Sequence, residues 1–163
     1  MGACSVLEKS ATYTCPNVLI LQDGNKLVKF KKGSRRDITD ILFEAEILNF
    51  KGSCKYENPA GKWETQIDLI VRFLVVRGNA NKSAGTRFKY FVAIPSFKNH
   101  VEGKSIFPVI GTFKGKRNTL LYEDRIRVRI PLDDPTHGAA LKILLGLQLS
   151  PEELRYNRDK RKN

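Results

Sequence analysis

The feature that most constrains the fold is a period of two in the apolar side chains between residues 65 and 77. The segment reads TQIDLIVRFLVVR, and its odd positions from Ile67 to Val75 are all apolar, whereas Asp68 and Arg72 lie between them. Successive side chains of a β-strand point to opposite faces of a sheet, so a period of two indicates a strand with one buried face. We therefore predict a central strand over residues 65–77.

The same alternation recurs in other segments. In residues 41–50 it separates Phe43 and Ile47 from the glutamates Glu44 and Glu46, although a helix is the competing interpretation there. Four further segments have patterns that favour strands; they are residues 88–97, 106–113, 125–132 and 140–150. In residues 125–132, isoleucine or valine alternates with arginine. Prolines at 95, 108 and 131 indicate sheet edges, bulges or strand ends, because proline has no backbone N–H to donate.

Turn and cap signals complete the expected architecture. Asp23-Gly24 lies between two apolar runs and predicts a β-hairpin over residues 18–30. Ser150-Pro151-Glu152-Glu153 has the form of a helix capping box and predicts a short helix over residues 151–158.

About eight strands and one helix predict an all-β protein, an antiparallel β-sandwich or barrel, of which we favour an immunoglobulin-like sandwich. We expect one domain over residues 17–158, an N-terminal lipidation site and tether over residues 1–16, and a basic tail over residues 159–163.

The chain has three cysteines, Cys4, Cys15 and Cys54. Cys15 and Cys54 both lie beside predicted strands, so we hypothesise that they form a disulfide in an oxidising compartment; two buried free thiols are the alternative. Cys4 follows small residues in MGAC, the pattern at which bacterial lipoprotein signals are cleaved, which suggests lipidation at Cys4. The basic and apolar parts of such a signal do not precede Met1 in this sequence, so that signal is either absent or lies upstream.

A formal net charge of +12 indicates a polyanionic partner, either nucleic acid or an anionic lipid surface. The candidate polyanion-binding residues form two clusters. The first consists of Lys29, Lys31, Lys32, Arg35 and Arg36, and the second of Arg125, Arg127 and Arg129. The first cluster contains a single aromatic residue, Phe30. Nucleic-acid surfaces commonly interleave aromatic side chains for base stacking, so we do not favour nucleic acid as the partner.

Residues typical of catalysis or metal binding are few. The sequence contains no nucleophile elbow, phosphate-binding loop, zinc-ligand spacing or calcium loop. His100 and His137 lie in turn-like segments, where a solvated loop histidine is the simpler interpretation, and Asp133 and Asp134 fit either a polar loop or a cation site. We expect no catalytic residues, no metal site and no cofactor.

Several short segments, taken in order, resemble a family of alphaproteobacterial cell-envelope lipoproteins of unknown function. The resemblance extends from Cys4 to Arg158 and rests on Cys4 followed by CPNVLIL, DITDILFEAEI, GSCKYE, YFVAI, IPL and GLQLSPEELRYNR. It implies a lipidated Cys4 and export across the inner membrane, which would make a disulfide between Cys15 and Cys54 chemically reasonable. It implies no enzymatic activity. The sequence departs from the family in lacking the upstream signal and in being rich in lysine.

The favoured function is therefore a lipid-anchored, periplasm-facing envelope protein with a non-catalytic binding or scaffolding role. Its expected partners are the membrane, reached through the lipid anchor, and another envelope protein. The alternative is a cytosolic basic module that binds nucleic-acid phosphates through residues 26–36 and 125–129 and shows a steep salt dependence.

Overall fold

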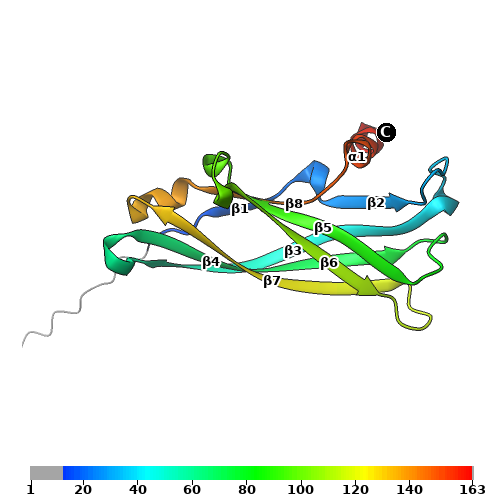
Figure 1. The fold of residues 1–163 in the computed structure, drawn as a ribbon, viewed down its shortest axis with the longest axis horizontal. Helices are drawn as coiled ribbons and strands as arrows, with labels where there is room; N and C mark the ends of the chain where they lie inside the picture. The colour runs from blue at the N-terminus through cyan, green and yellow to red at the C-terminus, as the bar shows by residue number, and fades with distance from the viewer. Residues whose placement is uncertain (1–12, 163) are drawn as a thin grey trace, which may run out of the picture.

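Two four-stranded sheets pack face to face in a computed structural model that describes residues 13–162 (Figure 1). Sheet A has the strand order β1 (Asn17–Ile20), β8 (Lys142–Leu147), β5 (Gly85–Ala93) and β6 (Lys104–Thr112). Sheet B has the order β2 (Lys26–Phe30), β3 (Ile41–Glu57), β4 (Trp63–Arg77) and β7 (Thr119–Leu132). The helix α1 (Pro151–Lys162) ends the fold. The predicted all-β sandwich with a C-terminal helix is confirmed.

The core lies between the sheets and is built from the alternating apolar positions of the strands. The odd positions of β4 from Ile67 to Val75 are at most 3% exposed, and Phe43 and Ile47 of β3 are 4% and 2% exposed. Ile143 of β8 faces them from sheet A. Burying a large apolar side chain contributes about 1.5–3 kcal/mol, so this pattern favours strands over helices at residues 41–50 and 140–150.

The hairpin predicted over residues 18–30 is wrong, because β1 and β2 lie in different sheets. β1 pairs in parallel with β8, and the Leu21 N–H donates to the carbonyl of Leu145 at 2.9 Å. Asp23 and Gly24 instead form a 3-10 turn, η1 (Gln22–Gly24), and Gly24 is not among the residues with positive φ that a primed hairpin turn needs. The turn carries the chain from one sheet to the other.

The other strand pairs are antiparallel, and the two longest join β4 to β3 and to β7. The register of β3 and β4 runs from Phe43 opposite Arg77 to Glu57 opposite Glu64. β6 and β7 are edge strands that contain Pro108 and Pro131, as the proline positions indicate.

A constant-type immunoglobulin domain has its first two strands side by side in one sheet, whereas β1 and β2 are separated here.

The helix α1 begins with the capping box that the sequence indicates. The Ser150 N–H donates to Glu153 Oε2 at 2.8 Å, and the Glu153 N–H donates to Ser150 Oγ at 3.2 Å. The helix continues to Lys162, so residues 159–162 are its last turn rather than the separate tail that the sequence suggests. Basic side chains in a last helical turn interact favourably with the helix dipole, which accounts for the extension.

A polar contact links the two sheets inside the core. Tyr90 of β5 is fully buried, and its hydroxyl donates to Asp124 Oδ2 of β7 at 2.8 Å. Burial and the neighbouring Asp124 carboxylate raise the pKa of Tyr90, so its hydroxyl stays protonated and remains a donor. The rings of Phe73 and Phe107 lie 5.0 Å and 5.2 Å from that of Tyr90.

We predict that Tyr90→Phe lowers the free energy of unfolding by about 1.5–3 kcal/mol, because it leaves the inward-facing Asp124 carboxylate without its donor. Urea unfolding measures the effect. Tyr122→Phe is the matched control, since it also removes a hydroxyl from the aromatic cluster but leaves the bond to Asp124 intact. Equal losses in the two variants would contradict the assignment of this contact.

Candidate functional site

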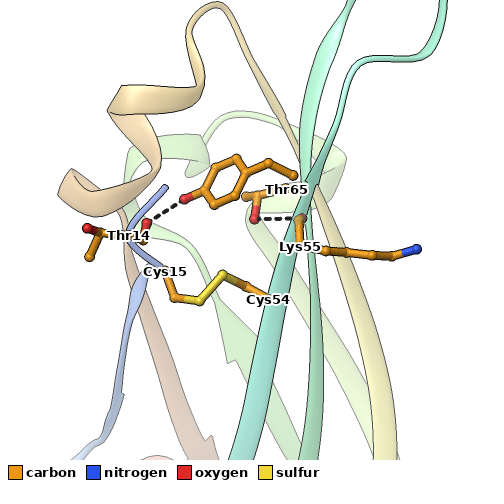
Figure 2. Close-up of a disulfide and its surroundings, with 6 residues drawn as sticks. Thr14, Cys15, Cys54, Lys55 and Thr65 are labelled. Carbon is orange, nitrogen blue, oxygen red and sulfur yellow. Dashed lines mark hydrogen bonds between the residues drawn. A yellow bond between two sulfur atoms is a disulfide. The ribbon is translucent and has the colours of Figure 1, made fainter. Parts of the chain in front are cut away.

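The start of the described chain is fastened to sheet B by a disulfide. Cys15 directly precedes β1, Cys54 lies on β3, and their Cα atoms are 5.8 Å apart (Figure 2). The predicted pairing of Cys15 with Cys54 is confirmed. The bond joins an edge of sheet A to sheet B, so it holds the two layers together at one end of the sandwich.

Aromatic side chains hold the residues just before Cys15 in place. The Tyr56 hydroxyl donates to the carbonyl of Thr14 at 2.6 Å, and burial raises the pKa of that hydroxyl. The ring of Tyr13 lies 5.2 Å from that of Tyr56 and 5.7 Å from that of Trp63. Gly138 completes the contact, because a Cβ there would stand 2.0 Å from the Tyr56 hydroxyl. The chain is therefore fixed from Tyr13 onward, whereas Cys4 lies outside the described residues.

We predict that replacing Cys15 and Cys54 together by serine lowers the free energy of unfolding by about 4 kcal/mol, because the bond restricts the unfolded chain. Its two cysteines are 39 residues apart. Urea unfolding, with and without reductant, measures the effect. Cys4→Ser is the matched control and should leave the midpoint unchanged and the sensitivity to reductant intact.

The first predicted basic cluster lies where α1 packs against β2, away from the disulfide (Figure 1). Lys29 Nζ lies 2.9 Å from Glu153 Oε1, and Arg36 forms an ion pair with Glu152. A cleft of about 490 Å³ lies between β2 and the start of α1. The remaining cations of the cluster are exposed; they are Lys31, Lys32 and Arg35. Two of the five residues of this cluster, Lys29 and Arg36, therefore hold the helix.

The far half of α1 is held by Asp23 and the backbone around it. Arg158 Nε and Arg161 Nη1 lie 3.1 Å and 2.6 Å from the Asp23 carboxylate. Asn157 Nδ2 donates to the carbonyls of Asp23 and Lys26 at 3.0 Å and 2.7 Å. Charged and polar contacts thus run along the docked helix.

Glu153 joins the cap of α1 to its docking contact. Burial alone would raise the pKa of Glu153, but the Ser150 N–H and the Lys29 ammonium outweigh it and hold the pKa below its usual range. A carboxylate with a lowered pKa in the folded state stabilises that state above its ordinary pKa, and this contribution disappears as pH falls through the lowered value.

We predict that α1 loosens as pH falls through the lowered pKa of Glu153, because the carboxylate then becomes protonated. At neutral pH, Glu153→Gln should weaken docking by about 1 kcal/mol and speed amide exchange in α1 about fivefold relative to β4. Glu152→Gln is the matched control and should have a smaller effect, since the Glu152 side chain is 66% exposed and that of Glu153 is 17% exposed. If the protection of α1 amides relative to those of β4 does not change with pH, this role of Glu153 is contradicted.

The second predicted basic cluster lies on the outer face of sheet B. Arg127 Nε donates to Asp68 Oδ1 of β4 at 2.6 Å, and this bond holds the pKa of Asp68 below its usual range. Arg125 and Arg129 are exposed on the same face of β7. β2 and β7 form opposite edges of sheet B, with β3 and β4 between them. The structure therefore does not bring the two predicted clusters together into one patch.

The acidic loop beside His137 has a structural role. Asp134 accepts a hydrogen bond from the Thr136 N–H at 2.7 Å and caps the turn η6 (Pro135–Ala140). The Thr136 side chain and backbone both lower the pKa of Asp134. Within the described residues, no three His, Cys, Asp or Glu side chains lie close enough together to hold a metal ion.

Sequence reasoning missed a third basic surface, on the outer face of sheet A. It carries four cations, Arg87, Lys89, Lys104 and Lys142, which are all exposed. A signal was present, because the segments 85–93, 104–112 and 142–147 contain no Asp or Glu. That these segments lie side by side in one sheet was not apparent from the sequence.

Comparison with known proteins gives no relative from which a function could be transferred. No protein-family model, no curated protein and no solved structure matches the chain at a significant level. No helix within residues 13–162 has the length and apolar character needed to cross a membrane.

Proposed function

We propose that this chain is a lipid-anchored, periplasm-facing envelope protein with a non-catalytic binding or scaffolding role. The observation that carries the proposal is the disulfide between Cys15 and Cys54. Structural disulfides persist in oxidising compartments and are rare in the reducing cytosol. Because the disulfide uses two of the three cysteines, Cys4 is the remaining one, and it lies in the small-small-Cys pattern. Cys4 would carry the acyl chains.

The position of the disulfide suits an anchor at Cys4. It fixes the chain at Cys15, directly before β1. The eleven residues from Cys4 to Cys15 (15 − 4) can span at most about 40 Å when fully extended. A sandwich on such a short tether would stay close to the bilayer and present its outer faces to the membrane or to an envelope protein partner.

The contacts of the polar side chains support binding or scaffolding. The ionisable groups with shifted pKa values make structural contacts. Tyr90 links the two sheets, Asp134 caps a turn, and Asp68 accepts a hydrogen bond from the neighbouring strand. The cytosolic nucleic-acid module has weaker support, since its two basic clusters lie on opposite edges of sheet B and are partly neutralised by acidic partners.

We predict that the protein isolated from its native cell, expressed from its full gene, carries acyl chains on Cys4 and partitions into a detergent phase. Intact-mass analysis of the N-terminal fragment measures the modification. Cys4→Ser should move the protein to the aqueous phase, whereas Ser5→Ala, the adjacent control, should not.

Alkylation of thiols in intact cells tests the compartment separately. Cys15 and Cys54 should be protected until a reductant is added. An unmodified Cys4 would overturn the anchor, and freely alkylated Cys15 and Cys54 would overturn the periplasmic location and favour the cytosolic alternative.

A further inference from the structure

The two sheets differ sharply in charge. The strands of sheet A contain four cations and, over their described residues, no Asp or Glu. The strands of sheet B carry acidic residues as well as basic ones; the acidic residues are Glu44, Glu46, Glu57, Glu64, Asp68, Glu123 and Asp124. The excess of basic over acidic residues on the strands is therefore greater in sheet A.

The cations of sheet A share its outer face with apolar side chains. Cross-strand partners in an antiparallel pair lie on the same face. Arg87 lies opposite Ile110, and Lys89 lies opposite Pro108. The inward positions that alternate with them, such as Phe88, are buried in the core. Each cation on this part of the face is thus next to an apolar neighbour.

Aliphatic side chains of β6 are exposed on this face. Ile106 and Ile110 of β6 are 50% and 59% exposed, and Leu19 of β1, at the opposite edge of the sheet, is 41% exposed. Pro108, between the two isoleucines, is also exposed. A cluster of exposed apolar residues is typical of a surface that binds a partner or a membrane.

The aromatic ring on this face is already occupied. Phe91 lies against Gly146, where an added Cβ would come within 2.8 Å of the Phe91 ring. Lys104 Nζ lies 4.4 Å from the centre of the same ring, a cation–π contact. The ring is therefore not an open platform on which a nucleic-acid base could stack.

The cations of sheet A also differ from those of sheet B in their partners. On sheet B, ion pairs cross the strands, as between Lys26 and Glu46 at 3.4 Å and between Arg72 and Glu123 at 2.5 Å. None of the four cations on sheet A has an ion-pair partner among the described residues. Their charge is available to an external anion.

We propose that the outer face of sheet A binds an anionic lipid bilayer. Arg87, Lys89, Lys104 and Lys142 contact lipid phosphates, while the exposed aliphatic side chains reach the boundary between head groups and acyl chains. Each Lys or Arg near an anionic membrane strengthens the attraction to it, and apolar burial adds to this attraction. The face is a second membrane contact besides the proposed acyl chains, and it binds lipid without them.

The test uses the full chain with Cys4→Ser, which has no acyl chain, and sedimentation with lipid vesicles. The protein should bind phosphatidylcholine vesicles that contain about 30% phosphatidylglycerol, and bind pure phosphatidylcholine vesicles far more weakly. Binding should decrease as salt rises above roughly 0.1 M, because salt screens the attraction. Equal binding to the two kinds of vesicle, or no binding to either, would overturn the proposal.

Two triple variants with the same change in net charge locate the contact. The test variant combines Arg87→Glu, Lys89→Glu and Lys104→Glu on sheet A. The control variant combines Lys51→Glu, Arg125→Glu and Arg129→Glu, which are exposed positions on the outer face of sheet B. The test variant should lose about a hundredfold in vesicle affinity and the control at most a few-fold. Equal losses would show that net charge, not this face, drives binding.

A second pair of variants tests the aliphatic contribution without changing charge. Ile106→Ser with Ile110→Ser should weaken vesicle binding about tenfold. Val76→Ser with Leu121→Ser, at exposed positions on sheet B, should not weaken it. Circular dichroism checks that each variant is folded.

Binding to single-stranded DNA is measured in parallel. The proposal would be overturned in favour of a nucleic-acid surface if the protein binds DNA but no vesicles, and if the sheet A variants abolish this DNA binding. The acylation state of native Cys4 is measured on wild-type protein, so failure of the anchor and failure of this face are distinguishable.

Discussion

Apolar packing between the inner faces of the two sheets is the interaction on which the rest of the structure depends. Every strand gives alternate side chains to this core, and the odd positions of β4 from Ile67 to Val75 lie at its centre. The bond between Tyr90 and Asp124 adds a directional contact across the layers. Since the inner faces are committed to packing, binding is left to the outer faces, the edges and the two ends.

The outer faces carry charge in different ways. Sheet B has pairs such as Arg127 with Asp68, whose opposite charges compensate each other across neighbouring strands. Sheet A has cations interleaved with exposed aliphatic side chains, and no acidic residue on its strands. Exposed ion pairs contribute little to stability, so the contrast matters more for what each face can attract than for the fold.

The two ends of the chain are held by different chemistry. At the start of the described chain, the disulfide and the bond from Tyr56 to Thr14 fasten the first strand to sheet B. At the C-terminal end, α1 is held against β2 and η1 by ion pairs and hydrogen bonds to Asp23 and Lys29, and salt weakens these ion pairs. The covalent end is the one nearer in sequence to Cys4, so a pull on an anchor there would be borne by the disulfide.

The sequence by itself determined the strands around residues 65–77 and 125–132 and the cap of α1, because alternation and capping are local properties of the chain. It left a helix as the alternative at residues 41–50, and two free thiols as the alternative to the disulfide between Cys15 and Cys54, and the tertiary structure decided both. The sequence also led to a hairpin at Asp23-Gly24 that does not form. Only the tertiary structure decided that β1 pairs with β8, that Lys29 and Arg36 hold α1, and that β1, β8, β5 and β6, none of which contains Asp or Glu, form one sheet. These outcomes depend on contacts between segments far apart in sequence, whose free energy is set by packing in three dimensions and not by any short pattern.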